Sequence, residues 1–348
     1  MLITLRVSSV SPLILSRMIK FSFPALTALM IFVLSQGLPV RIAAQKSQLK
    51  HPYASTSRIS EPTIFAEGVI STGDYESHLS FTPDGSTVYY LVSTPSFNHW
   101  TIVVSRFDKG KWGAPEVAPF SGQYDDADPF ISRDGSKFWF ISNRPVDAKR
   151  KTDMDIWVME KTGDGWGTPN HLGPTVNSTA NEWFPTVADD GTLYFGSERN
   201  GGAGGADLYR CRLVNGQYMQ AENLGNAVNS AGGEYEPFIA HDQSYLIFAA
   251  IGRSDGLGAF DLYISYRRDS GWSKAANLGT VINTGAIEFS PSVSPDGKYL
   301  FFASTRGFAD QPLARKFSYP ELKAALHKPR NGLGDIYQID LEALKLTH

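Results

Sequence analysis

Short runs of apolar or alternating residues recur along most of the chain, in pairs separated by a tight polar turn. In the last pair, residues 289–293 precede the turn formed by Asp296 and Gly297, and residues 299–303 follow it. Alternation of apolar and polar positions is typical of a half-buried β-strand, and a short continuous apolar run is consistent with a buried one. Two such runs around an Asp-Gly turn predict a β-hairpin.

This hairpin is repeated five times. Its turn recurs at residues 84–85, 134–135, 190–191, 242–243 and 296–297, so that successive copies are 50–56 residues apart. A third strand-like run follows in every copy, and in the first four copies a further run carries an aromatic residue, namely Trp112, Trp166, Tyr218 or Trp272. Four antiparallel strands repeated around an axis are the plan of a propeller. The sequence therefore predicts an all-β propeller of five four-stranded blades, with six blades as the alternative.

The two ends of the repeat array complement each other. The fifth copy ends near residue 341 without a fourth strand, whereas an unpaired strand-like segment, 63–71, precedes the first copy. We predict that this N-terminal strand completes the last blade, because ring closure removes an exposed sheet edge. The propeller then spans residues 62–341, after a linker at 45–61 and before a C-terminal tail at 342–348.

An insertion at residues 307–333 interrupts the fifth copy. Ser318 stands before a run of helical character at 319–326, and serine is a preferred residue at a helix N-cap. We therefore predict a short helix here. We interpret the insertion as a surface loop, with a lid over one face of the propeller as the alternative.

Several motifs of these copies resemble a known repeat. They are EFSPSVSPDG at residues 288–297, NEWFP at 181–185, Ser-Thr-Arg at 304–306 and Asp-Ile-Tyr at 335–337. Together they resemble the WD40-like propeller repeat of the periplasmic TolB type, over nearly all of the predicted domain. The resemblance implies the fold. That family includes periplasmic scaffolds that bind other envelope proteins, and similar repeats occur beside peptidoglycan-binding domains and in some exported enzymes. This chain has five copies where TolB has six blades, and we expect no counterpart of the N-terminal α/β domain of TolB.

The N-terminal segment predicts export. Lys20 precedes an apolar run at 21–34, and the small residues at 42–44 suit cleavage by signal peptidase. We interpret residues 1–44 as a signal peptide with an upstream extension, and an uncleaved anchor is the alternative. The expected protein is periplasmic or secreted, with no membrane span in its mature form. The single cysteine, Cys211, cannot form an internal disulfide, and we expect it to be a small packed residue.

Charge and composition narrow the classes of partner. The formal net charge is −3 and the isoelectric point is about 6.2, so lysine and arginine are not in excess and no nucleic-acid partner is expected. We also expect no cofactor. Calcium at residues 125–128 (DDAD) is the alternative, because carboxylate oxygens suit that ion, although the spacing of a known calcium loop is lacking.

Every copy carries a carboxylate nine residues before the second residue of its turn. These ring carboxylates are Glu76, Asp126, Glu182, Glu234 and Glu288. Since the innermost strand of a blade lines the channel, the spacing predicts five acidic side chains at one channel mouth. They could bind a cation, a basic peptide or a sugar, and two of them could act as acid and base. The alternative is a structural tie between blades, which their identical placement in all five copies favours.

The next two positions differ between copies. The first is Ser77, Ala127, Trp183, Tyr235 or Phe289, and the second is His78, Asp128, Phe184, Glu236 or Ser290. Aromatic platforms beside carboxylates and a histidine are common in carbohydrate recognition. The tentative ligand-binding set is therefore the ring carboxylates with His78, Asp128, Trp183, Tyr235, Glu236 and Phe289. Packing between blades is the alternative for the aromatic residues.

A second recurring set predicts structural ion pairs. Four copies have an arginine after the second strand and an aspartate at the start of the third, and the first copy has Thr94 and Thr101 instead. Because both members are present or absent together, we predict charge pairs within each blade. The predicted pairs are Arg144 with Asp155, Arg199 with Asp207, Arg253 with Asp261, and Arg306 with Asp335.

These features support three functional hypotheses. The leading one is a non-enzymatic binding module or scaffold, which contacts an envelope protein or a cell-wall, peptidoglycan or other polysaccharide ligand at the channel mouth. The alternative is an exported carbohydrate-active enzyme, a hydrolase or lyase, that uses carboxylates of the ring with His78 or a tyrosine assisting. A purely structural scaffold is the third. No catalytic residue is assigned from the sequence.

Overall fold

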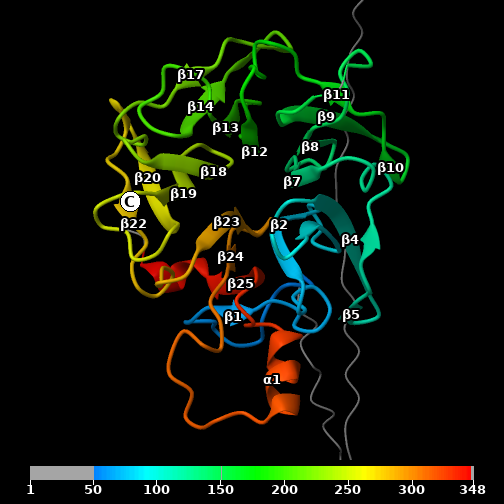
Figure 1. Ribbon diagram of the computed structural model, residues 1–348. Helices are drawn as coiled ribbons and strands as arrows, with labels where there is room; N and C mark the ends of the chain where they lie inside the picture. The colour runs from blue at the N-terminus through cyan, green and yellow to red at the C-terminus, as the bar shows by residue number, and fades with distance from the viewer. Residues whose placement is uncertain (1–50, 150, 346–348) are drawn as a thin grey trace, which may run out of the picture. The chain divides into compact units, whose positions relative to one another are not determined.

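Five sheets surround a central axis in the computed structural model, which describes residues 51–149 and 151–345 (Figure 1). The predicted five-bladed propeller is thus confirmed, and the alternative of six blades is excluded. The predicted signal segment, 1–44, lies outside the described residues. Within the described part of the chain, no helix has the length and hydrophobicity needed to cross a membrane.

Each blade is an antiparallel sheet whose first three strands run outward from the channel in sequence order. The innermost strands of blades 1 to 5 are β2 (Tyr75–Phe81), β7 (Asp126–Ile131), β12 (Glu182–Val187), β18 (Gly233–Ile239) and β23 (Glu288–Val293). The second strands are β3 (Thr87–Ser93), β8 (Lys137–Ser142), β13 (Leu193–Ser197), β19 (Tyr245–Ile251) and β24 (Tyr299–Ser304). The third strands are β4 (Trp100–Asp108), β9 (Asp155–Thr162), β14 (Asp207–Cys211), β20 (Asp261–Arg268) and β25 (Asp335–Asp340).

The outermost strands are short pieces. They are β5 (Lys111–Trp112), β6 (Glu116–Val117), β10 (Gly165–Trp166), β11 (Asn170–His171), β17 (Glu222–Asn223), β21 (Gly271–Trp272) and β22 (Ala276–Asn277), with the small hairpin β15 (Leu213–Val214) and β16 (Gln217–Tyr218). In blade 5 the outer strand is β1 (Thr63–Ile64), which pairs antiparallel with β25. The prediction that the N-terminal strand closes the ring is confirmed. The preceding segment also packs on the propeller, because Tyr53 is buried in its core.

The turn between the first two strands has the same backbone in every blade. Its second residue adopts a left-handed conformation, with φ between 61° and 83° at Gly85, Gly135, Gly191, Gln243 and Gly297. Glycine meets this requirement without strain, which explains why the motif marks the repeat.

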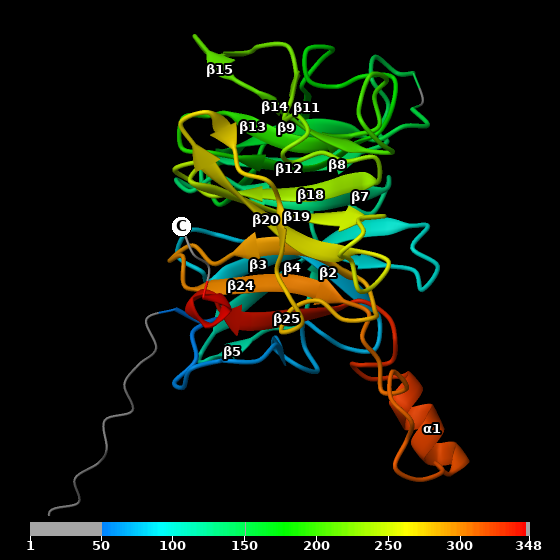
Figure 2. The same cartoon turned by 90° about the vertical axis from the view of Figure 1, so that its left-hand side faces the viewer.

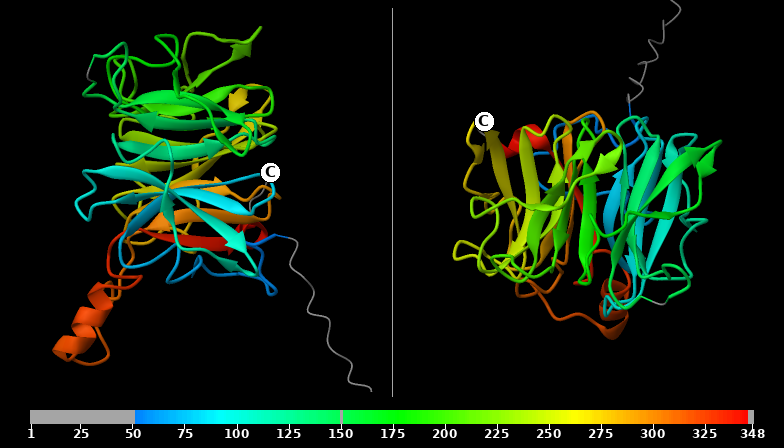
Figure 3. Two further views of the ribbon diagram at one scale, coloured as in Figure 1. Left: turned by 90° about the vertical axis from the view of Figure 1, so that its right-hand side faces the viewer. Right: turned by 90° about the horizontal axis from the view of Figure 1, so that it is seen from above.

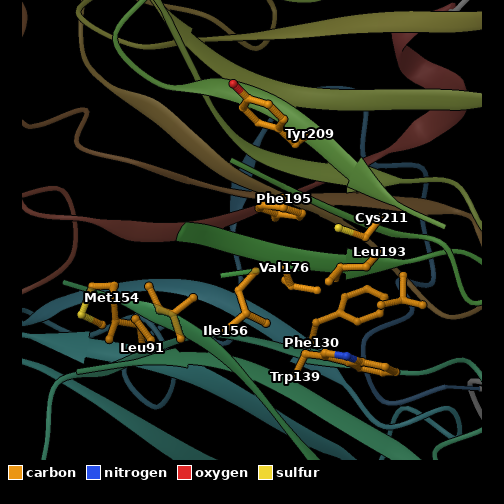
Figure 4. Close-up of a cluster of buried hydrophobic side chains, with 13 residues drawn as sticks. Leu91, Phe130, Trp139, Met154, Ile156, Val176, Leu193, Phe195, Tyr209 and Cys211 are labelled. Carbon is orange, nitrogen blue, oxygen red and sulfur yellow. The ribbon is translucent and has the colours of Figure 1, made fainter. Parts of the chain in front are cut away.

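Apolar side chains fill the space between neighbouring blades. Figure 4 shows one such cluster, in which Leu91 of blade 1 and Ile156 of blade 2 are buried together with Phe195 and Cys211 of blade 3. Full burial of a large apolar side chain contributes about 1.5–3 kcal/mol each. Cys211 is a packed core residue as predicted, and burial raises the pKa of its thiol to about 12.

The insertion in blade 5 carries the predicted helix, α1 (Tyr319–Leu326), and a 3₁₀ turn, η1 (Leu341–Leu344), follows the last strand. Ser318 precedes α1, and its backbone N–H donates to the carboxylate of Glu321 at 2.8 Å. Figure 2 shows that α1 stands clear of the blades, and the views in Figure 3 agree. The helix therefore does not cover the channel, and the interpretation as a surface loop is favoured over that of a lid.

Candidate functional site

The ring carboxylates are buried beside the channel and do not line its mouth. Asp126, Glu182, Glu234 and Glu288 are fully buried, and Glu76 is 2% exposed. In blades 2 to 5 each one pairs with an arginine of its own blade, at 2.7 Å for Asp126–Arg144, 3.0 Å for Glu182–Arg199, 2.8 Å for Glu234–Arg253 and 3.1 Å for Glu288–Arg306. A buried charge needs such a partner. The ring is therefore part of the framework.

The arginines were predicted to pair with the aspartates that begin the third strands, and this pairing is wrong. Instead, Asp207 accepts hydrogen bonds from the N–H groups of Ala203 and Gly204, at 2.7 and 3.2 Å. Asp261 and Asp335 likewise accept from backbone N–H groups of the loops before them. Asp155 contacts the side chains of Lys151 and His171. These aspartates fix the loops that lead into the third strands.

Blade 1 lacks the arginine, because Thr94 occupies its position. Glu76 is left with hydrogen bonds from the N–H and hydroxyl of Thr72. Burial raises the pKa of Glu76 to about 8, against the lowering effect of these bonds. Glu76 thus has no arginine partner and holds its proton near neutral pH.

We expect Glu76→Gln to raise the free energy of unfolding at pH 8 by roughly 2–4 kcal/mol and to change it little at pH 5. The raised pKa means that the stability associated with the protonated carboxyl is complete below about pH 4.5 and is lost as the pH rises through about 8. An amide resembles the protonated acid at every pH. The measurement is denaturant unfolding of parent and variant at both pH values.

The matched control for this experiment is Glu182→Gln. Its arginine partner lies 3.0 Å away, so the neutral amide leaves Arg199 without a counter-charge. This variant should be less stable than the parent at pH 5 and at pH 8. A Glu76→Gln variant that follows the control at pH 8 would contradict the assignment.

A bulge in each innermost strand forms the channel lining. The register between the first two strands shifts within this segment in all five blades. The residue two positions after the ring carboxylate has a positive φ in each blade, between 47° and 56°, at His78, Asp128, Phe184, Glu236 and Ser290. Bulges re-aim side chains, and they are frequent beside functional sites. Here they bring residues from different blades together at the axis.

Three of these residues form a charged cluster, which we call the central clamp. Nε2 of His78 lies 3.2 Å from Oδ1 of Asp128 and 3.1 Å from Oε1 of Glu236, and its Nδ1 lies 2.6 Å from the hydroxyl of Ser77. The second oxygen of Asp128 accepts from the N–H of Phe184 at 2.8 Å, and that of Glu236 accepts from the N–H of Ser290. The clamp therefore connects all five blades.

The clamp shifts the protonation of its members. Burial of the His78 imidazole opposes its charged form, but Asp128 and Glu236 together outweigh this effect and raise the pKa of His78. Burial raises the pKa of Asp128 to about 6, although His78 acts in the opposite direction. An imidazolium between two carboxylates is the state that these contacts favour.

A pocket of about 260 Å³ opens above the clamp. Its lining includes all three clamp residues and half-buried aromatic side chains, namely Phe97, Trp100, Trp183 and Tyr235. Glu236 is the most accessible charged group in it, with 17% of its side chain exposed, against 4% and 5% for His78 and Asp128. Of the tentative site, the pocket unites His78, Asp128, Trp183, Tyr235 and Glu236.

Two aromatic pocket residues were not predicted from the sequence. Phe97 lies in the connection between β3 and β4, and Trp100 is the first residue of β4, where its Nε1 donates to the carbonyl of Phe97 at 3.1 Å. The signal that could have found them is this aromatic pair, three residues apart, at the start of the third strand of copy 1. Phe289, which was predicted, is buried and packs against the ring of His78, with centroids 5.7 Å apart. It does not line the pocket.

The Asp125–Asp128 segment does not gather its carboxylates. Asp125 contacts His99 and Asn143, Asp126 pairs with Arg144, and Asp128 belongs to the clamp. No group of three or more residues that could hold a metal ion is found in the described part of the chain.

Comparisons with known proteins concern the fold. No family model matches the chain, and no curated protein matches it. A solved RGII complex of BT0996 matches with a TM-score of 0.54 and 8% identity, over 82% of this chain and 92% of that one. A structure described as TolB from Agrobacterium tumefaciens has a TM-score of 0.44 and 15% identity, over 77% and 91%. An α-L-arabinofuranosidase from Lactobacillus brevis has a TM-score of 0.47 and 12% identity, over 79% and 92%. At these identities the likeness concerns the propeller alone.

Proposed function

We propose that this chain is an exported binding propeller that holds one ring of a carbohydrate in the pocket above the central clamp. The observation that carries the proposal is the aromatic wall of that pocket around the partly exposed carboxylate of Glu236. The flat faces of sugar rings pack on aromatic side chains, and their hydroxyl groups donate to carboxylates. A volume of about 260 Å³ suits a single ring better than an extended chain.

Binding is favoured over catalysis by the state of the two carboxylates. Both oxygens of Asp128 and both oxygens of Glu236 already accept a hydrogen bond or contact His78. A general base or nucleophile in such a network would have to leave its partners before reacting. The clamp is therefore better suited to fix the pocket floor and to present Glu236 as an acceptor.

The alternative, a carbohydrate-active enzyme, is supported by one observation. Asp128 has a pKa of about 6, close to the range of a general acid, and Glu236 shares its histidine partner. If the clamp opens when substrate binds, these two carboxylates become the acid and the base. Product analysis decides between the two functions.

Export agrees with a cell-wall or other extracellular polysaccharide as the source of the ligand. This part of the proposal rests on the signal-like segment of residues 1–44 and on the lack of an excess of basic residues. An envelope protein bound at the same face is the competing partner. The polysaccharide and the envelope protein can be distinguished, because only a free oligosaccharide would bind within the pocket.

We expect Trp183→Ala to weaken oligosaccharide binding at least about tenfold, because half-buried Trp183 forms part of the aromatic wall. The measurement is titration calorimetry of residues 45–348 with a panel of oligosaccharides and soluble peptidoglycan fragments, chosen first by thermal shift. Each ligand that binds is then incubated with the protein, and the products are analysed.

The matched control is Trp272→Ala, which removes a half-buried tryptophan from the outer strand of blade 4, outside the pocket. It should lower stability and leave affinity unchanged. Equal affinities of Trp183→Ala and the parent would contradict the proposal. Turnover that Asp128→Asn abolishes would establish the enzyme instead.

A further inference from the structure

A second cavity, of about 550 Å³, lies at the rim of blade 5. Blade 5 differs from the others because its outer strand, β1, comes from the N-terminal part of the chain. The insertion lies beside it. Side chains or backbone from the blade, the insertion and the N-terminal segment line the cavity, and they include Pro62, Arg306, Gly307, Asp310, Arg330 and Tyr337.

The hydroxyl of Tyr337 is the first unusual group in this cavity. Tyr337 is 1% exposed, and its buried hydroxyl oxygen has no hydrogen-bond partner in the described part of the chain. The equivalent residue of blade 4, Tyr263, donates to Asp255 at 2.8 Å. Both rings lie under the arginine of their blade at 4.8 Å. Blade 5 thus keeps the tyrosine but has no acceptor for the hydrogen bond of its hydroxyl. A buried donor without an acceptor costs free energy.

Arg330 is the second group. It has a left-handed φ of 67°, and its backbone is held on both sides, because its N–H donates to Asp335 at 2.6 Å and its carbonyl accepts from Phe308 at 2.7 Å. Its guanidinium forms no salt bridge with a described residue, and it lies near enough to the Tyr337 hydroxyl to favour loss of that proton. A backbone held in this conformation positions the side chain at the cavity.

The remaining charged groups of the wall are already engaged. The guanidinium of Arg306 pairs with Glu288 at 3.1 Å and donates to the carbonyl of Ile282 at 2.7 Å. One oxygen of Asp310 accepts from the N–H of Gly307 at 2.7 Å. The cavity is left with a guanidinium that has no salt bridge to a described residue and that faces the Tyr337 hydroxyl, and with a hydroxyl whose proton no described residue accepts.

We propose that this cavity, the rim site, binds the carboxylate of an acidic ligand, with Arg330 and Tyr337 as the two donors. A guanidinium presents paired N–H groups that match the two oxygens of a carboxylate, and a buried phenol adds a third directed bond. The hydroxyl remains a donor over the working range, because burial raises the pKa of Tyr337 to about 12. The rim site and the central pocket are separate sites. Either can bind an acidic saccharide, the rim site through its carboxylate and the central pocket through its ring.

The test uses glucuronate as the probe and glucuronamide as its uncharged match, with binding measured by saturation-transfer NMR and titration calorimetry at constant ionic strength. The parent should bind glucuronate more tightly than glucuronamide. Arg330→Gln should weaken glucuronate binding at least about tenfold, since a charged partner is lost. Tyr337→Phe should weaken it several-fold and melt no lower than the parent, because no described residue accepts a hydrogen bond from its hydroxyl.

The matched control is Tyr263→Phe, which removes the same atom from blade 4 and breaks the bond to Asp255. It should melt lower and bind glucuronate as the parent does. The proposal is overturned if glucuronate does not bind, if glucuronamide binds equally well, or if Arg330→Gln leaves the affinity unchanged. It is also overturned if Trp183→Ala abolishes glucuronate binding, because the carboxylate then binds in the central pocket.

Discussion

Replacing Arg199 with methionine is expected to lower the free energy of unfolding by about 3–5 kcal/mol, because it leaves the carboxylate of Glu182 buried without its counter-charge. The guanidinium also donates to the carbonyl of Val176 at 2.6 Å, and methionine cannot replace that bond. Denaturant unfolding followed by circular dichroism measures the change. The double variant Arg199→Met/Glu182→Gln should recover most of the loss, since the stranded charge is removed.

An exposed pair provides the matched control. Arg212 contacts Glu222 at 2.7 Å, but its side chain is 56% exposed, so Arg212→Met should change stability by less than about 1 kcal/mol. The interpretation fails if Arg199→Met is no more destabilising than this control, or if the double variant is as unstable as the single one. Either result would mean that the buried carboxylate of Glu182 does not require Arg199 as its counter-charge.

The repeat made the fold predictable from one sequence. Each copy contains a turn that needs a residue in the left-handed conformation, and the runs on either side of this turn can be buried as strands. The same local pattern occurs five times in the sequence. The pairing of β1 with β25 followed because the first and last copies were incomplete in opposite ways. Both inferences rest on regular strand geometry. Because side chains alternate between the two faces of a strand, this geometry appears in the sequence as a period of two residues.

The ion pairs could not be assigned in this way, because pairing depends on which strand ends meet in space. Thr94 and Thr101 replaced both predicted partners in blade 1, and this suggested that the two positions contact each other. The structure shows that the arginine position faces the ring carboxylate, as in the pair Arg144–Asp126. Blade 1 in fact keeps its ring carboxylate but has no arginine to pair with it, and burial raises the pKa of Glu76 to about 8.

The candidate site was predictable only where it breaks the symmetry of the repeat. His78, Asp128 and Glu236 differ from their counterparts in other copies, and they meet at the axis because a bulge turns each of them inward. Phe97 lies in the connection to the third strand and Trp100 begins that strand, and because this connection differs in length and sequence between copies, comparison of the copies could not reveal them. The proposed binding site is formed by these departures, whereas the ring carboxylates are paired within the framework.

Replacing His78 with glutamine is expected to lower the free energy of unfolding by about 3–5 kcal/mol at pH 7 and by much less at pH 4–5. The imidazolium lies within 3.2 Å of Asp128 and Glu236, and its loss leaves the buried carboxylate of Asp128 beside the half-buried carboxylate of Glu236. At low pH Asp128 takes up a proton, so the deficit becomes smaller. Unfolding measured from pH 4 to pH 8 gives both values.

The parent protein itself should become less stable as the pH rises across this range. The contribution of His78 is complete below its ordinary pKa of 6.5 and is lost as the pH rises through its raised pKa. Asp128 acts in the same direction between 3.8 and about 6, because its neutral form is favoured in the folded state. His99→Gln is the matched control, since His99 also contacts an aspartate, at 2.8 Å, but its side chain is 56% exposed. It should leave the pH profile unchanged, and a His78→Gln profile that parallels the parent would show that the clamp does not carry the charge that we assign to it.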